Sequence, residues 1–238
     1  MTRRKGLFIT GTDTGVGKTW TGAALTRFLV RQGLRVAVCK PVETGVADPS
    51  RPGADAGLLL EACGCDWPLE LAAPYRLTRP LAPDQAARMD QVRLDINHMT
   101  EAVDALADRA DFIIVEGAGG LMVPLSGGML IADLAARLNF PLLVVARPNL
   151  GTINHTLLTT FAARQMNLAL AGVIISGMPA TPDEAEANAP HAIASLASAP
   201  LLATLPHIDA GMPAGIDLLA DALERSPSLP WLQQALGL

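Results

Sequence analysis

The sequence has few aromatic residues. It also has few cysteines and no long apolar run, and each of these two shortages excludes a class of protein. No stretch reaches the roughly 18 apolar residues that a membrane-spanning helix requires. The only cysteines, Cys39, Cys63 and Cys65, are odd in number and offer no disulfide framework. Cys63 and Cys65 also lack the second pair that a structural zinc site would need. The first apolar segment runs into a glycine-rich loop rather than a cleavage site, so we expect a cytoplasmic protein.

Lysine is also scarce. Only Lys5, Lys18 and Lys40 stand among the 18 basic residues, and the others are arginines scattered along the chain. With a formal net charge of −5, this distribution argues against a nucleic-acid surface. A lysine ammonium is a compact charge on a flexible stem, which a planar guanidinium does not replace. Lys18, at the end of the glycine-rich loop, and Lys40, after an apolar run, therefore stand out as candidates for a functional role.

The glycine-rich loop at residues 11–19 lies between an apolar strand candidate at 7–9 and a helical pattern at 18–32. In such a loop the backbone amides converge on phosphate oxygens, the lysine bridges the terminal phosphates and the following hydroxyl ligates Mg²⁺. Thr12 stands where the usual pattern has glycine, and Gly11 comes one position earlier, so the match is a variant. The loop predicts nucleotide binding by Gly15, Val16, Gly17, Lys18, Thr19 and Trp20.

Strand and helix patterns alternate along the rest of the chain. Apolar runs predict strands at 35–39, 112–115, 141–146, 171–176 and 200–205, and helical spacing predicts helices at 55–63, 95–109, 153–166, 183–196 and 216–224. The proline-rich segment 67–91 shows no regular pattern beyond a short strand candidate at 74–77. The alternation predicts a P-loop NTPase-type α/β fold, a mostly parallel sheet with helices on both faces. We expect residues 1–238 to form this single domain.

Polar residues stand where several of these strands end. Lys40 and Thr44 follow one strand, and Glu116 follows another. In a parallel sheet such ends project toward one edge, which is where open α/β sheets bind ligands. Glu116 comes after four apolar residues, which favours a Mg²⁺ ligand over an acid that caps nearby amides. Asp55 opens a helix, where an acid is equally expected as a cap, so both roles stay open for it.

Four motifs together resemble the dethiobiotin synthetase family. They are GTDTGVGKT at 11–19, KPVETG at 40–45, VEGAGG at 115–120 and LGTINHT at 150–156. Related P-loop proteins share the first motif, whereas the four in this order and spacing are specific. The similarity extends over residues 6–206.

The resemblance implies an ATP- and Mg²⁺-dependent enzyme of biotin synthesis that converts 7,8-diaminononanoate and CO₂ into dethiobiotin. One amine would capture CO₂ as a carbamate, the carbamate oxygen would attack the γ-phosphate, and the second amine would close the ureido ring as phosphate leaves the resulting carbamic-phosphoric anhydride. Lys18 and Lys40 would be catalytic, because they neutralise the carbamate and the migrating phosphoryl group. By the same resemblance Thr19, Asp55 and Glu116 would surround Mg²⁺.

The resemblance also implies where the substrate lies. Thr14 and Thr44 would bind the substrate, with Thr44 at its carbamate end, and a helix start contributed by a second subunit would hold its carboxylate. That helix start comprises Gly151, Thr152, Ile153 and Asn154, whose free amides favour an anion without a basic side chain. We therefore expect a homodimer with active sites at its interface. A simple capped helix is the structural alternative.

The adenine contact departs from the family pattern. The further nucleotide contacts that the resemblance implies are Gly117, Ala118, Gly119, Ser176, Gly177, Pro206, His207 and Ile208. Where familiar members carry Asn-Asp, this chain has Ser176-Gly177. An asparagine side chain both donates and accepts, whereas serine offers one hydroxyl and glycine nothing. We therefore predict a weaker preference for ATP over other nucleoside triphosphates. Gly15 also replaces an acid that some members carry.

Two other functions compete with this interpretation. A partition-type P-loop switch would usually carry a second lysine at the start of the loop, and residues 11–15 contain none. Another amide-forming ligase of the same branch would typically add a glutaminase domain, for which we expect no room in this chain. The cysteines also offer no clear glutaminase nucleophile. We expect neither nucleic acid nor membrane as a partner.

Overall fold

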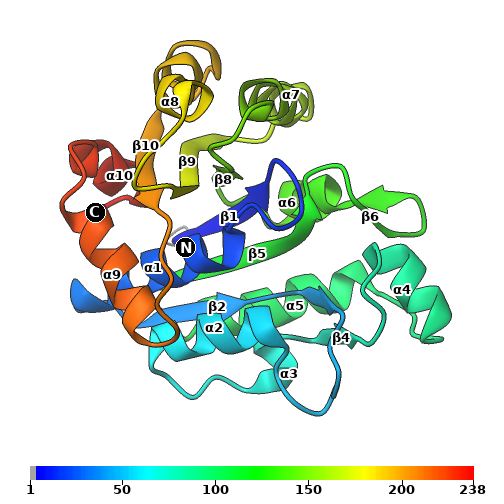
Figure 1. Cartoon of the computed structure of the whole chain (residues 1–238). Helices are drawn as coiled ribbons and strands as arrows, with labels where there is room; N and C mark the ends of the chain where they lie inside the picture. The colour runs from blue at the N-terminus through cyan, green and yellow to red at the C-terminus, as the bar shows by residue number, and fades with distance from the viewer. Residues whose placement is uncertain (1–3) are drawn as a thin grey trace.

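The structure is a computed structural model that describes residues 4–238, and its centre is a six-stranded sheet (Figure 1). Every neighbouring pair of strands runs parallel. Across the sheet the order is β10 (Leu201–Pro206), β9 (Leu170–Met178), β8 (Leu142–Ala146), β1 (Gly6–Gly11), β5 (Phe112–Gly120) and β2 (Val36–Cys39). This architecture confirms the predicted α/β fold with a mostly parallel sheet.

The central strands are buried along most of their length. Every residue of β1, β2 and β8 is buried, and so are the first seven residues of β5. Because helices cover both faces of the sheet, side chains on both sides leave the water, and each strand is therefore a continuous apolar run rather than an alternating one.

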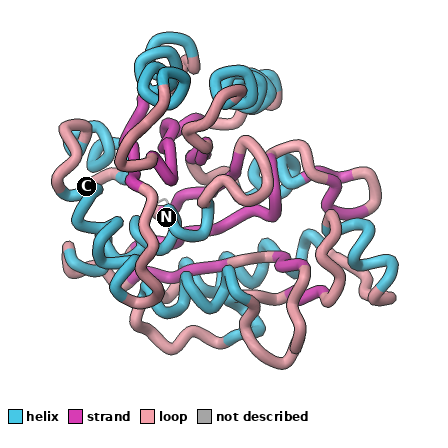
Figure 2. Tube along the Cα trace, in the orientation of Figure 1, coloured by secondary structure: helices cyan, strands magenta, loops and turns pink. Residues whose placement is uncertain are grey.

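Helices form a layer on each face of the sheet. On one face the core residues of the sheet pack against α1 (Lys18–Arg31), α9 (Ala214–Glu224) and α10 (Leu229–Leu236). On the other face they pack against α5 (Ile96–Ala107), α6 (Ile131–Leu138), α7 (Thr152–Gln165) and α8 (Glu184–Leu196). At the β2 edge, α2 (Ala54–Cys63) contacts both α1 and β2. Figure 2 shows loops joining these alternating strands and helices.

The segment 67–91 is more ordered than the sequence predicted. It contains α3 (Leu69–Ala72), β4 (Tyr75–Leu77) and α4 (Pro83–Met89), and β4 pairs with an unpredicted short strand, β3 (Val42–Thr44). The Trp67 indole N–H donates to the Val36 carbonyl at 3.0 Å, and the Lys40 amide donates to the Ala72 carbonyl at 2.7 Å. Contacts with the sheet edge, rather than local periodicity, therefore order this segment.

Other differences concern element bounds. The hairpin β6 (Pro124–Ser126) and β7 (Met129–Leu130) and the helix α6 were not predicted. β5 continues to Gly120, so Glu116 lies inside this strand rather than after it. Within residues 4–238 no helix combines the length and the apolar character that crossing a bilayer requires.

Candidate active site at the carboxyl edge of the sheet

The glycine-rich loop turns directly from β1 into α1. Gly15 and Gly17 have φ angles of +73° and +91°, which glycine adopts without strain. The Lys18 side chain is buried and folds back over the loop, where Nζ donates to the Asp13 carbonyl at 3.0 Å. A Cβ atom at Gly11 would lie only 2.9 Å from Lys18 Nζ and 2.6 Å from the Asp13 oxygen. The early glycine of the variant motif therefore makes room for the lysine.

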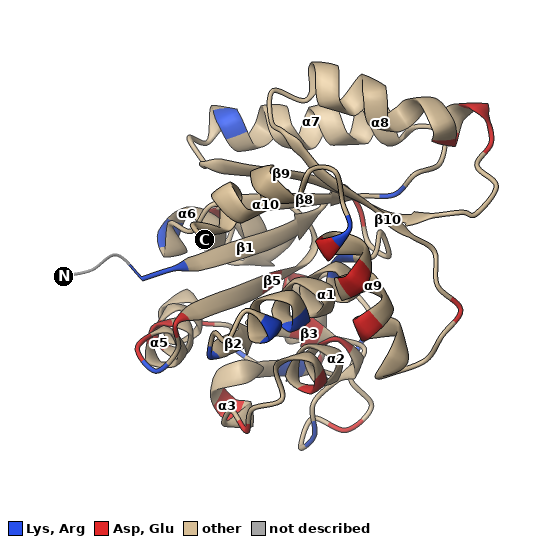
Figure 3. Ribbon diagram, turned by 90° about the vertical axis from the view of Figure 1, so that its left-hand side faces the viewer, with Lys and Arg blue, Asp and Glu red and all other residues tan. Residues whose placement is uncertain are grey.

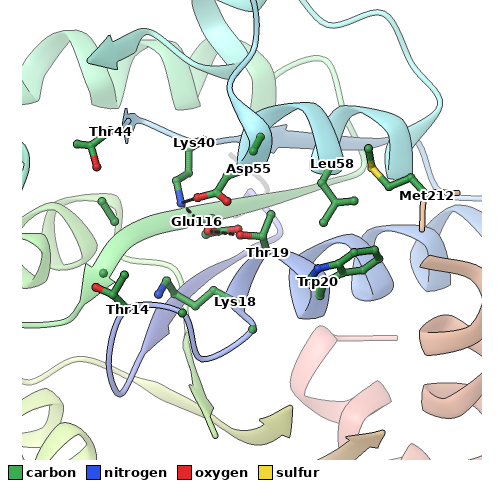
Figure 4. A pocket seen from close by; sticks show the side chains of 15 residues that line it. Thr14, Lys18, Thr19, Trp20, Lys40, Thr44, Asp55, Leu58, Glu116 and Met212 are labelled. Carbon is green, nitrogen blue, oxygen red and sulfur yellow. Dashed lines mark hydrogen bonds and ion pairs between the residues drawn. The ribbon is translucent and has the colours of Figure 1, made fainter. Parts of the chain in front are cut away.

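Lys40 connects two carboxylates at the floor of the site (Figure 4). Its Nζ lies 2.5 Å from Glu116 Oε1 and 2.7 Å from Asp55 Oδ2. Thr19 Oγ1 donates to the same Glu116 oxygen at 3.0 Å. The structure thus brings together four residues that the sequence singled out, from α1, α2, β5 and the segment after β2.

Strand register explains why Lys40 meets Glu116. In the parallel pairing of β2 with β5, Cys39 lies opposite Val115. Lys40 follows Cys39 and Glu116 follows Val115, so these two residues also lie side by side at the carboxyl edge of the sheet. Asp55 does not cap its own helix, because its carboxylate contacts Lys40 and the N-cap of α2 is Gly53. The alternative role of Asp55 as a helix cap is wrong.

The charges of this cluster support one another. Burial alone would lower the pKa of Lys40, but the attraction of Glu116 and Asp55 and their hydrogen bonds outweigh it and raise this pKa. Burial alone would raise the pKa of Asp55, but the Lys40 ammonium outweighs it and lowers this pKa. For Lys18 the nearby carboxylates do not outweigh burial. Burial lowers the pKa of Lys18, and the neighbouring charge of Lys40 lowers it further. The charged forms of Lys40 and Asp55 therefore favour one another, and Lys40 also contacts the buried Glu116.

The oxygen atoms of this cluster fit a small hard cation. Glu116 Oε2 is buried and has no hydrogen-bond partner among the described residues. The candidate ligands are carboxylates and a hydroxyl, the donor types that Mg²⁺ prefers. No group of three or more His, Cys, Asp or Glu side chains able to hold a metal occurs in residues 4–238. Two carboxylates and Thr19 would therefore complete a Mg²⁺ shell only together with phosphate oxygens and water, as is usual for this ion.

Two adjoining cavities surround the loop. The larger, of about 560 Å³, contains the Lys40 cluster and is lined also by Thr14, Thr44, Ala118 and Gly119. The smaller, of about 290 Å³, is lined by Val16, Ser176, Gly177, Pro206, His207 and Ile208. Gly15, Gly17 and Trp20 line both cavities. Lys18 and the predicted metal ligands, together with Thr14 and Thr44, thus face one cavity, and the predicted base contacts face the other, with the loop between them.

Gly117 lines neither of these two cavities. It packs against the core, where an added Cβ would meet Ile131 at 2.9 Å and Phe8 at 3.1 Å. Its carbonyl is 3.4 Å from Lys40 Nζ. Gly117 therefore contacts the site through the lysine and does not line the cavity.

The predicted helix start at α7 also lies apart from the Lys40 cavity. Gly151 is the N-cap of α7, with φ +94° and no side-chain cap, and none of Gly151, Thr152, Ile153 and Asn154 lines either cavity. The Thr152 amide already donates to the Asn149 carbonyl at 3.1 Å. The expectation of four free amides is therefore wrong for Thr152. Within one chain this helix start does not join the rest of the site.

Several residues that line the cavities were not predicted. Leu58 and Met212 border the larger cavity, and Arg147 borders the smaller one. Arg147 directly follows a buried strand, the same signal that pointed to Glu116, so the sequence could have identified it. Leu58 and Met212 carry no such signal, because apolar residues on a helix and in a loop are ordinarily core or surface positions.

Comparisons with known proteins agree with this geometry. The family model of the AAA domain matches residues 5–214. The ATP-dependent dethiobiotin synthetase BioD of Anaeromyxobacter sp. (strain K) is 44% identical over 202 residues, which cover 85% of this chain and 90% of that protein. The protein of the same name from Bacillus licheniformis is 38% identical over 212 residues, covering 89% of this chain and 90% of that protein.

Solved structures with a similar fold come from P-loop ATPases. The ParA family ATPase from Chlorobium tepidum has a TM-score of 0.57 at 13% identity, covering 99% of this chain and all of that one. The septum site-determining protein MinD from Pyrococcus horikoshii, solved with Mg-ADP, has a TM-score of 0.57 at 18% identity, covering 98% of this chain and 90% of that one. At such low identity these matches establish the fold alone.

Proposed function

The chain belongs to the ATP-dependent dethiobiotin synthetase family, and from this premise we propose which residues carry its reaction. The enzyme closes the ureido ring of dethiobiotin from 7,8-diaminononanoate and CO₂ at the expense of ATP. One observation carries the assignment of the site: two buried lysines, Lys18 and Lys40, line one cavity beside Thr19, Asp55 and Glu116. A phosphoryl transfer to a carbamate needs such concentrated positive charge, because negative charge spreads over the migrating group.

The two lysines have different surroundings and hence different roles. Lys18 leaves the phosphate loop and reaches the Asp13 carbonyl, so its ammonium would contact the terminal phosphates of ATP. Lys40 is held by Glu116 and Asp55 on the opposite wall and would face the carbamate. The carbamate oxygen attacks the γ-phosphorus, ADP leaves, and the second amine then attacks the carbamoyl carbon and expels phosphate. Both lysines stabilise negative charge along this path.

Mg²⁺ would be held by Thr19, Asp55 and Glu116. This ion supplies charge neutralisation of the phosphates when bound. The unpartnered Oε2 of Glu116 supports the assignment, because a buried carboxylate oxygen without a hydrogen-bond donor is suited to a cation. The base of the nucleotide would lie beyond Gly15, Gly17 and Trp20, in the cavity that contains Ser176 and His207.

The diamine would lie in the larger cavity, with its carbamate end at Thr14 and Thr44. Its carboxylate would reach the α7 start of a second copy, at Gly151, Thr152, Ile153 and Asn154. This placement accounts for the separation of the helix start from the site within one chain. The amides of Ile153 and Asn154 and the positive end of the α7 dipole would attract the carboxylate.

An exposed apolar face supports the homodimer. Leu158 and Phe161 of α7 are 59% and 60% exposed, and Leu150 and Met122 nearby are 82% and 53% exposed. Met122 and Leu158 line a third cavity, of about 340 Å³, together with Thr12, Asp13 and Thr14. The apolar face therefore adjoins the phosphate loop. A second copy that covered it would bring its own α7 start toward this site.

The ParA and MinD folds do not favour a partition-type switch. Their resemblance is one of fold, and this chain lacks a lysine in residues 11–15. In Figure 3 the parts of the ribbon that belong to Lys and Arg are dispersed over several elements. We further propose that residues 1–238 act as one domain and that the enzyme works in the cytoplasm, where its three free cysteines would remain reduced.

The test is phosphate release from ATP and Mg²⁺ with bicarbonate, measured with and without 7,8-diaminononanoate, together with mass spectrometry for dethiobiotin. We expect phosphate release that depends on the diamine and matches the product in amount. Hydrolysis that ignores the diamine and yields no dethiobiotin would contradict the proposed function and support the switch.

A further inference from the structure

Glu43 is a buried acid with no part in the proposed reaction. It is the middle residue of β3, and only 4% of it is exposed. Its Oε1 accepts the Asp55 amide at 2.8 Å and its Oε2 accepts the Ala56 amide at 3.1 Å. A side chain from β3 therefore binds the first turn of α2.

The N-terminal start of α2 has free amides and enough room for this carboxylate. The N-cap residue is Gly53, which has no side chain to bond the free amides of its own helix. A Cβ atom at Gly53 would lie 2.2 Å from Glu43 Oε1. Because Gly53 has no side chain, the Glu43 carboxylate has room at the start of α2.

The bonded segments are the two that carry the Lys40–Asp55 pair. Glu43 lies between Lys40 and Thr44, both of which line the larger cavity. The amide that Glu43 binds belongs to Asp55, whose carboxylate lies 2.7 Å from Lys40 Nζ. A shift of α2 relative to β3 would move the Asp55 carboxylate away from Lys40 and Glu116.

We infer that Glu43 is a positioning residue that ties the start of α2 to the Lys40–Thr44 segment and so sets the place of the Asp55 carboxylate. The inference rests on the proposed role of Asp55 in holding Mg²⁺. A residue that orients a metal ligand typically changes metal affinity by about tenfold or more when it is removed. A residue that merely caps a helix changes stability and leaves metal affinity alone.

The test compares Glu43→Ala with Asp95→Ala. Asp95 is the matched control, because its side chain caps α5 through the Asn97 amide at 2.8 Å and it lines neither of the two cavities at the site. Mn²⁺ binding is titrated by electron paramagnetic resonance in the presence of a non-hydrolysable ATP analogue, and thermal unfolding is followed in parallel. We expect both variants to unfold at lower temperature and only Glu43→Ala to bind Mn²⁺ on the order of tenfold more weakly.

A second variant separates positioning from capping. In Glu43→Ala/Gly53→Ser the serine hydroxyl would cap the Asp55 or Ala56 amide from within α2. We expect it to restore the unfolding temperature but not the Mn²⁺ affinity, because the tie to β3 stays broken. Restoration of both, or unchanged Mn²⁺ binding in Glu43→Ala, would overturn the inference. Absence of Mn²⁺ binding in the wild type would instead overturn the metal assignment, and the inference with it.

Discussion

Lys40 Nζ lies 2.5 Å from Glu116 Oε1, and both side chains are buried. The opposed positions of Cys39 and Val115 in the β2–β5 pairing place these two residues side by side. A buried ion pair contributes little net stability, but removing one partner leaves an uncompensated charge in a medium of low dielectric constant. Replacing one residue of this pair should therefore change both the free energy of unfolding and the enzymatic activity.

Replacing Lys40 with methionine should destabilise the protein strongly, because Glu116 would lose its buried cation. We expect the free energy of unfolding in urea to fall by about 3–5 kcal/mol. The double variant Lys40→Met/Glu116→Gln should recover much of this loss, since only the partly exposed Asp55 carboxylate then lacks its cation. Both variants should fail to form dethiobiotin. A loss below about 1 kcal/mol in Lys40→Met, typical of exposed pairs, would contradict the buried pairing.

Gly17 and Gly33 form a matched pair for testing the phosphate loop. Both have positive φ, +91° and +82°, so alanine strains the backbone similarly at each position. At Gly17 the added Cβ would also lie 2.4 Å from Ser176 Oγ, whereas at Gly33 it would meet nothing within 4 Å. We expect Gly33→Ala to lose about 1 kcal/mol of stability and Gly17→Ala to lose more, because of the contact with Ser176, and only Gly17→Ala to lose ATP affinity, measured by calorimetry. Equal ATP affinity in the two variants would argue against the loop as the binding element.

Local pattern predicted the strands of the six-stranded sheet and the residues at their ends. Lys40 and Glu116 could be identified because a charge at the edge of a fully apolar run has no structural explanation, and four motifs in order identified the family. The role of Glu43 could not be predicted, since the amides that it binds lie 12 and 13 residues further along the chain. An acid in the middle of a short strand is ordinarily solvent-facing, and only the docking of α2 buries it. The same holds for α3, which contacts β2 and α5, and for α4, which contacts β3, β4 and β6.

Asp90 should contribute a pH-dependent part of the stability. Its carboxylate accepts the Thr78 hydroxyl at 2.6 Å and the Thr78 amide at 2.5 Å, and these bonds lower its pKa from the ordinary value of 3.8. The contribution is therefore complete above about pH 4 and is lost as the pH falls through the lower folded-state pKa. We expect Asp90→Asn to unfold at a lower temperature than the wild type at pH 7, with the difference shrinking in acid. A difference independent of pH would show that the charge is immaterial.

The nucleobase contact should be permissive. Ser176 is buried against Gly17, and Gly177 has no side chain to read a base edge. We expect kcat/KM values for ATP and CTP of similar size, whereas a preference above about a hundredfold, or about 2.7 kcal/mol, would contradict the prediction. Ser176→Asn adds both a donor and an acceptor, so it should raise the ATP to CTP ratio above that of the wild type.

A site shared between two subunits can be tested by mixing two inactive variants. Lys18→Met removes the phosphate-loop lysine, and Asn154→Asp places a negative charge at the α7 start, where it would repel the substrate carboxylate while favouring the helix dipole. If each site combines the loop of one chain with the α7 start of the other, random mixed dimers contain one intact site among every four. Unfolding and reassociating the two variants together should then restore about a quarter of wild-type activity, whereas each variant treated alone should stay inactive. If both elements came from the same chain, every site in the mixture would carry one of the two changes and no activity would return. Size-exclusion chromatography of Phe161→Asp, which adds a charge to the exposed apolar face of α7, should in turn show a monomer.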